Sequence, residues 1–114
     1  MREPNRDKGR LEDIVTYAAN VIEFVNGKSF EEFTSNKLLY FAVLKNVEII
    51  GEAAYMISLE FKEKHPELPW NEIVAMRHVL VHGYSNISDR NLWITATEDI
   101  APLKLQVEEY LKNM

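Results

Sequence analysis

The chain has 114 residues, a length that suits a single domain spanning residues 1–114. Its hydrophobic content of 46% is enough for a core, while the absence of cysteine excludes a disulfide framework and a thiolate-bound metal. Eighteen acidic against thirteen basic residues give a net charge of -5, which argues against coating nucleic acid through a broad positive surface.

Apolar residues at helical spacing near the N-terminus predict a first helix over residues 6–26. Gly27 then stands where a left-handed helix cap is expected. Ser29 opens a capping-box sequence, which predicts a short helical turn, and we expect its Phe30 and Phe33 to fill core. The apolar positions of the first helix are Leu11, Ile14, Val15, Ala18, Val21, Ile22 and Val25.

The same spacing predicts one long helix over residues 36–64, which the pair His65-Pro66 ends. Such a helix would measure about 40 Å, longer than a domain of this size, so we expect a partner subunit to cover the excess. Gly51, Ala53 and Ala54 would allow another helix to approach closely near its middle. Its apolar positions are Phe41, Leu44, Val47, Ile50, Ala54, Ile57 and Phe61.

Two further helices are predicted towards the C-terminus. One begins near Pro69, a residue tolerated in a first turn, and ends at Gly83. Ser88 is a good N-cap for the last helix, which Pro102 must kink or split. No segment alternates like a strand over a useful length, so we expect an all-α bundle of four to five main helices, one long and one proline-kinked.

Neither a secretion signal nor a membrane span is predicted. Residues 1–10 are polar and lack the apolar stretch of a signal peptide. The longest purely apolar run, residues 38–44, is far too short to cross a bilayer. We therefore expect a soluble, cytoplasmic protein with no membrane contact.

Two of the three histidines lie within one helical turn, just after an arginine. Arg77 is followed at once by His78, and after three apolar residues by His82, Gly83 and Tyr84. On a regular helix the two histidines are about 40° apart and share a face, whereas Arg77 and His82 are about 140° apart. Convergence needs either a helix that ends at Gly83 and frees His82, or a second subunit.

These residue types suit cleavage of RNA. An imidazole that titrates near neutral pH can take the proton of a 2′-hydroxyl or protonate the leaving oxygen. The guanidinium of Arg77 can stabilise the charge that develops on the phosphate. This chemistry needs neither a metal nor a cofactor, so a metal-independent ribonuclease centre is one interpretation of the segment from Arg77 to Tyr84.

Structural interpretations of the same residues remain open. Arg77 could pair with a carboxylate such as Glu52 or Glu72 while the histidines cap helix-end carbonyls, and spacing alone favours this interpretation. His78 and His82 also have the spacing of metal ligands, but no nearby cysteine or aspartate completes a set. The tyrosine that follows fits either a core aromatic or an exposed hydroxyl beside the site.

Arg77, four residues, His82, one residue and Tyr84 together resemble the signature of the HepT-like toxins. These are small ribonucleases of the HEPN superfamily that are encoded beside a nucleotidyltransferase antitoxin. The resemblance covers nearly the whole chain, since further landmarks follow in the same order. They are Ile50-Gly51-Glu52-Ala53, Pro69-Trp70 and Trp93.

The resemblance implies a helical homodimer whose two motifs meet in a cleft. It implies that Arg77 and His82 hold the catalytic positions, with His78 at an adjoining polar position where asparagine is common. It also implies that Tyr84 is the tyrosine to which such antitoxins transfer AMP, which would silence the enzyme. RNA is then the substrate, and the cognate nucleotidyltransferase antitoxin is the partner.

Three functional hypotheses follow. The first is the toxin of a toxin–antitoxin pair, a metal-independent RNA endonuclease acting through Arg77, His82 and His78 and silenced at Tyr84. The second is a non-catalytic helical dimer that binds a nucleotidyltransferase partner or a nucleotide through the same cleft. The third, a nucleotidyltransferase, is disfavoured because the four aspartates are scattered and leave no site for two metals.

Overall fold

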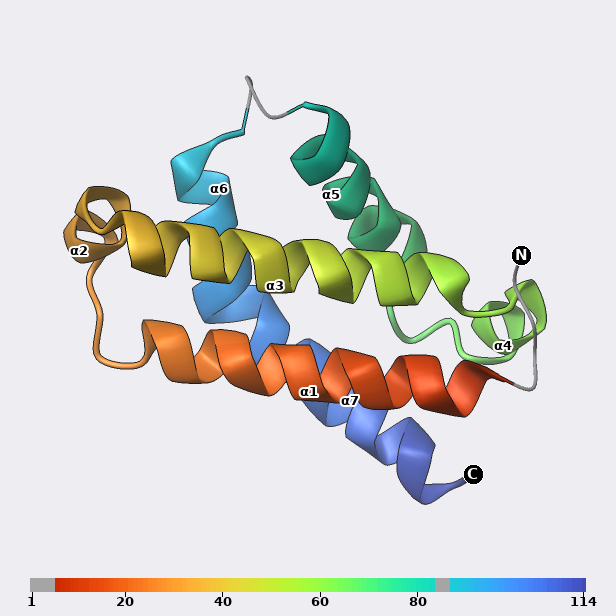
Figure 1. Ribbon diagram of the computed structural model, residues 1–114. Helices are drawn as coiled ribbons and strands as arrows, with labels where there is room; N and C mark the ends of the chain where they lie inside the picture. Colours follow the sequence, from red (N-terminus) through yellow and green to blue (C-terminus); the bar gives the residue numbers. More distant parts are fainter. Residues whose placement is uncertain (1–5, 84–86) are drawn as a thin grey trace.

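The structure is a computed structural model that describes residues 6–83 and 87–114. Every element in these ranges is helical, which confirms the predicted all-α class (Figure 1). The helices are α1 (Asp7–Val25), α2 (Phe30–Ser35), α3 (Lys37–Met56), α4 (Leu59–Lys64), α5 (Trp70–His82), α6 (Asp89–Ile94), the π-helical segment η3 (Thr95–Asp99) and α7 (Ile100–Lys112).

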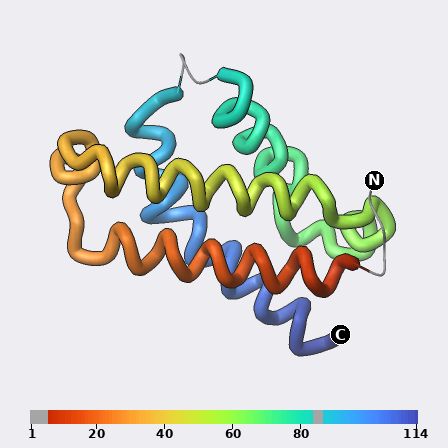
Figure 2. The backbone as a smooth tube through the Cα atoms, viewed as in Figure 1, coloured from red at the N-terminus to blue at the C-terminus, as the bar shows by residue number. Residues whose placement is uncertain are grey.

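The bundle is built on two long antiparallel helices, α1 and α3, which lie side by side (Figure 2). Helix α7 crosses α1 on the far side in this view, and α5 leans against α3 at a steep angle (Figure 1). Apolar side chains from these helices and from α6 form one core. Its members include Leu11, Ile14, Ala18, Val21, Val43, Val47, Ile50, Ala54, Leu92, Ile100, Leu103 and Val107.

The predicted connection between α1 and α3 is confirmed. Gly27 has a φ of 74°, the left-handed conformation that favours glycine after a helix end. The hydroxyl of Ser29 accepts the N–H of Glu32 at 3.1 Å, and the Glu32 carboxylate accepts the N–H of Ser29 at 3.0 Å. This capping box fixes α2, which buries Phe33 completely and leaves Phe30 at the margin of the core.

The single helix predicted over residues 36–64 is wrong, because α3 ends at Met56 and α4 starts again at Leu59. The N–H of Ser58 donates to the buried carboxylate of Asp7 at 2.9 Å, and the Ser58 hydroxyl donates to it at 2.6 Å. The Ser58 oxygen also accepts the N–H of Phe61 and caps α4. Ser58 is thereby withdrawn from the α3 hydrogen-bond ladder, and α3 is about 30 Å long.

The last predicted helix is divided as its proline requires. Ser88 caps α6 by accepting the N–H of Asn91 at 3.1 Å, as predicted. Pro102 is the third residue of α7, and the π-helical segment η3 directly precedes that helix. Proline has no N–H and its ring would collide with the carbonyl of Glu98 in a regular α-helix. The wider π turn removes this conflict, and it divides the predicted helix into α6 and α7.

The start of α5 is anchored by Trp70. Its indole N–H donates to the backbone carbonyl of His65 at 2.8 Å, and its ring stacks at 6.5 Å from that of Tyr110 on α7. The Tyr110 hydroxyl donates to the Glu67 carboxylate at 2.8 Å, and burial together with this bond raises the pKa of Tyr110 above its ordinary value. The N-terminal end of α5 is therefore fixed to the bundle, while its C-terminal end carries the candidate site.

Candidate functional site

The site begins where α5 crosses α3 at a glycine. A Cβ at Gly51 would overlap the Cβ of Arg77 and lie 3.1 Å from its Cα. Only a glycine at position 51 permits this approach without displacing a helix. The predicted close approach near the middle of the long helix is confirmed, and it brings Arg77 directly onto α3.

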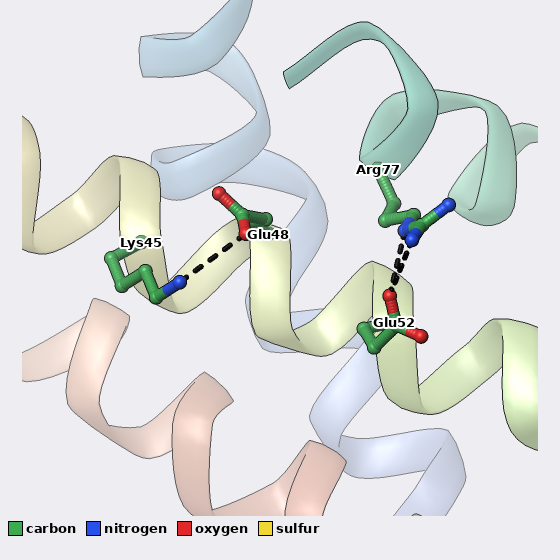
Figure 3. A network of polar contacts seen from close by, with 4 residues as sticks. All are labelled: Lys45, Glu48, Glu52 and Arg77. Carbon is green, nitrogen blue, oxygen red and sulfur yellow. Dashed lines mark hydrogen bonds and ion pairs between the residues drawn. The ribbon is translucent and has the colours of Figure 1, made fainter. Parts of the chain in front are cut away.

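Arg77 is held by the residue after that glycine. Its Nε donates to Oε1 of Glu52 at 2.8 Å, and its Nη2 forms an ion pair with the same oxygen at 2.7 Å (Figure 3). The guanidinium carbon also lies 5.6 Å from the ring centre of Tyr55, one turn further along α3. Of the five guanidinium N–H groups, two are used by Glu52, so the others can meet a phosphate. The Arg77 side chain keeps 25% exposure.

The two histidines share one exposed face of α5, as their spacing predicts. The ring centres of His78 and His82 are 4.8 Å apart, with 48° between the ring planes. Both side chains are exposed, although Gly83 is partly covered. The N–H of Gly83 donates to the carbonyl of Val79 at 2.8 Å, so α5 stays helical through His82.

Within one protomer, the described residues do not bring the predicted catalytic groups together. Arg77 faces Glu52 and Tyr55 of α3, whereas His82 contacts His78. Because α5 is regular, Arg77 and His82 point about 140° apart around its axis. Tyr84, the predicted AMP acceptor, lies outside the described residues.

The structure also bears on the ion pair and the metal ligands that the sequence left open. The predicted ion pair of Arg77 with Glu52 is present, while Glu72 is exposed on another part of α5. Among residues 6–83 and 87–114, no group of three or more histidine, aspartate or glutamate side chains could hold a metal ion. In those same ranges no helix is long and apolar enough to cross a membrane.

A groove that the sequence did not predict lies behind this crossing. It has a volume of about 520 Å³ and is bounded by α3, the N-terminal half of α5 and the start of α7. Its lining is mostly apolar, with carboxylates at Glu67, Glu72 and Asp99. No residue spacing signals it, because it arises from the steep angle of α5 on α3.

A family model described as "Ribonuclease HepT-like" matches residues 14–110. The chain is 43% identical over 105 residues to the "Probable ribonuclease HepT" of Thermococcus cleftensis, covering 92% of this chain and 96% of that protein. It is 42% identical over 101 residues to a candidate RNase of Methanocaldococcus jannaschii, covering 89% and 93% of the two chains. A candidate RNase of Caldanaerobacter subterraneus is 41% identical over 103 residues, covering 90% and 92%. No solved structure matches the chain.

Proposed function

Since this chain belongs to the HepT-like ribonuclease family, we propose that it is a metal-independent RNA endonuclease whose catalytic groups are Arg77 and His82. The observation that carries the proposal is the Glu52–Arg77 pair at the Gly51 crossing, directly followed along α5 by an exposed histidine pair. The family landmarks thus have a geometric meaning: Gly51 admits Arg77 to the surface of α3, and Glu52 orients its guanidinium.

The reaction requires one phosphate to meet both groups. A 2′-hydroxyl attacks the adjacent phosphorus, the O–P bond to the 5′-oxygen breaks, and a 2′,3′-cyclic phosphate and a 5′-hydroxyl result. His82 either accepts the 2′ proton as a neutral imidazole or delivers a proton to the leaving oxygen as an imidazolium. The N–H groups of Arg77 that Glu52 does not use stabilise the charge on the phosphoryl oxygens.

A second copy of the chain solves the divergence of Arg77 and His82, and the outer face of α3 suits such a copy. Phe41, expected on the inward stripe, is instead 58% exposed, and Tyr55 is 39% exposed on the same helix. Lys45 and Glu52 lie between them at helical spacing. In an antiparallel pairing of two α3 helices about position 48, Phe41 faces the partner's Tyr55, and Lys45 lies within one residue of the position opposite the partner's Glu52. The apolar positions are thus complementary, and Lys45, which pairs with Glu48 of its own chain at 3.3 Å, also lies near the partner's Glu52, which supports the proposed homodimer.

The proposal includes the regulation that the family resemblance implies. A nucleotidyltransferase antitoxin is the partner: the Tyr84 oxygen attacks the α-phosphorus of ATP, an O–P ester forms, and pyrophosphate leaves. Tyr84 follows His82 by two residues, a chain length of at most about 7 Å. A bulky anionic group at that distance repels RNA phosphate and blocks access to the imidazole.

The decisive experiment incubates total cellular RNA with purified protein in EDTA and compares wild type, Arg77→Ala and His82→Ala. Wild type should cleave, and each variant should lose at least a hundredfold in rate, with circular dichroism confirming an intact fold. His65→Gln, which changes a histidine remote from the site, is the matched control and should cleave. Equal cleavage by wild type and His82→Ala refutes the proposal.

Absence of cleavage by wild type instead favours the non-catalytic dimer that binds a nucleotidyltransferase or a nucleotide. Growth of the host separates these functions further. Arrest by the wild-type chain, relieved by His82→Ala or by co-expression of the partner, fits a toxin. Harmless wild-type expression together with partner binding fits the non-catalytic module.

A further inference from the structure

The histidine pair at the end of α5 has a geometry that catalysis by His82 alone does not require. His78 and His82 are four residues apart, both exposed, with ring centres separated by 4.8 Å. The primary amide of an asparagine at position 78 would also serve a polar contact. Two imidazoles at this distance form a potential chelate.

The ring separation can be compared with that of a metal chelate. A zinc ion bound by two imidazole nitrogens lies about 2.1 Å from each nitrogen and therefore about 3.2 Å from each ring centre. With a nitrogen–metal–nitrogen angle near the tetrahedral value, the two ring centres are about 5 Å apart. The 4.8 Å between His78 and His82 agrees with this value.

We propose that His78 and His82 bind one divalent transition metal ion, such as Zn²⁺, on the exposed C-terminal face of α5. Imidazole suits ions of this type, whereas Mg²⁺ prefers oxygen ligands. The negative end of the α5 dipole adds a favourable field for a cation at the last turn. Within the described part of the chain no third side chain joins the pair, so water completes the coordination and the ion exchanges readily.

The consequence for activity rests on the proposed function. A metal bound to His82 occupies the ring lone pair that would accept or carry the catalytic proton, so cleavage stops while the ion is bound. An asparagine at position 78 would leave one imidazole, which is not a chelate. Zinc inhibition is therefore a property of the pair and not of His82 alone.

Calorimetric titration with ZnCl₂ tests the site without reference to RNA. Wild type should bind one ion per chain, and His78→Asn should bind at least tenfold more weakly, as should His82→Ala. His65→Gln is the matched control and should bind as wild type does, and MgCl₂ should give no heat of binding.

Cleavage with zinc, divided by cleavage of the same variant in EDTA, tests the inhibition. For wild type this ratio should be about 0.1 or lower. For His78→Asn it should stay near one. Zinc affinity of His78→Asn equal to that of wild type overturns the site, as does no zinc binding by wild type. If wild type cleaves no RNA in EDTA, the ribonuclease proposal fails, and calorimetry still decides the metal site.

Discussion

Replacing Gly51 by alanine tests whether the crossing of α3 and α5 sets the position of Arg77. The new methyl group would overlap the Cβ of Arg77. The position of a Cβ is set by the backbone, so rotation of the side chain cannot relieve this overlap. Overpacking of this kind costs about 1–3 kcal/mol, and the near-complete overlap places it in the upper half of that range. Alanine has a higher helix propensity than glycine, which offsets about 1 kcal/mol of this cost. We expect Gly51→Ala to lower the free energy of unfolding by about 1–2 kcal/mol.

Urea denaturation followed by circular dichroism at 222 nm measures this change. Gly9→Ala is the matched control, because Gly9 is exposed on α1 and a Cβ there meets no atom within 4 Å. The free energy of unfolding of that variant should rise by about 0.5–1 kcal/mol, so the two substitutions should differ by about 1.5–3 kcal/mol. If Gly51→Ala is as stable as Gly9→Ala, the helices are not in the contact described. Displacement of Arg77 should also reduce cleavage by Gly51→Ala, but not by Gly9→Ala.

Three further substitutions follow from the same contacts. Asp7→Asn should lower the free energy of unfolding by about 1.5–3 kcal/mol, because the buried carboxylate accepts two bonds from Ser58. Lys45→Glu and Glu52→Lys should each weaken the dimer in analytical ultracentrifugation, whereas their mixture should restore it, because opposite charges then face each other. Glu52→Gln should change stability by less than about 1 kcal/mol and lower kcat through looser positioning of Arg77.

Each of these results has a control. Asp13→Asn, at an exposed position of the same helix, should leave stability unchanged, and an equal loss in both variants contradicts the buried contact. Failure of the mixed Lys45→Glu and Glu52→Lys chains to associate would contradict the antiparallel register. A large loss of stability in Glu52→Gln, with unchanged kcat per folded molecule, would make its ion pair with Arg77 purely structural.

Local signals in the sequence predicted most of the helices. Gly27, Ser29 and Ser88 act at the predicted helix ends because each acts on backbone groups within a few residues. The break between α3 and α4 was missed because apolar spacing continues through Ile57 and Phe61. Ser58 leaves the helix for a carboxylate 51 residues earlier in the chain, and no local pattern contains that contact.

The sequence could predict only those features of the candidate site that lie within a single helix. Helical periodicity places His78 and His82 on one face, and they lie there. From the sequence, Glu52 and Glu72 were both possible ion-pair partners of Arg77. Charge and spacing do not determine which carboxylate lies beside Arg77 where two helices cross. Helix α5 contacts α3 at Gly51, which brings Arg77 beside the next residue of α3, Glu52.

The ion pair of Arg77 and Glu52 does not by itself distinguish a structural role from a catalytic one. Glu52 is 46% exposed and Arg77 25%, and pairs this accessible contribute at most about 1 kcal/mol. A strong anchor would use both carboxylate oxygens, whereas here two N–H groups converge on one. Such a weak pair adds little to folding, yet it restricts the direction of a flexible guanidinium. A phosphate could then use the N–H groups that Glu52 does not, which agrees with the proposed role of Arg77 in binding RNA.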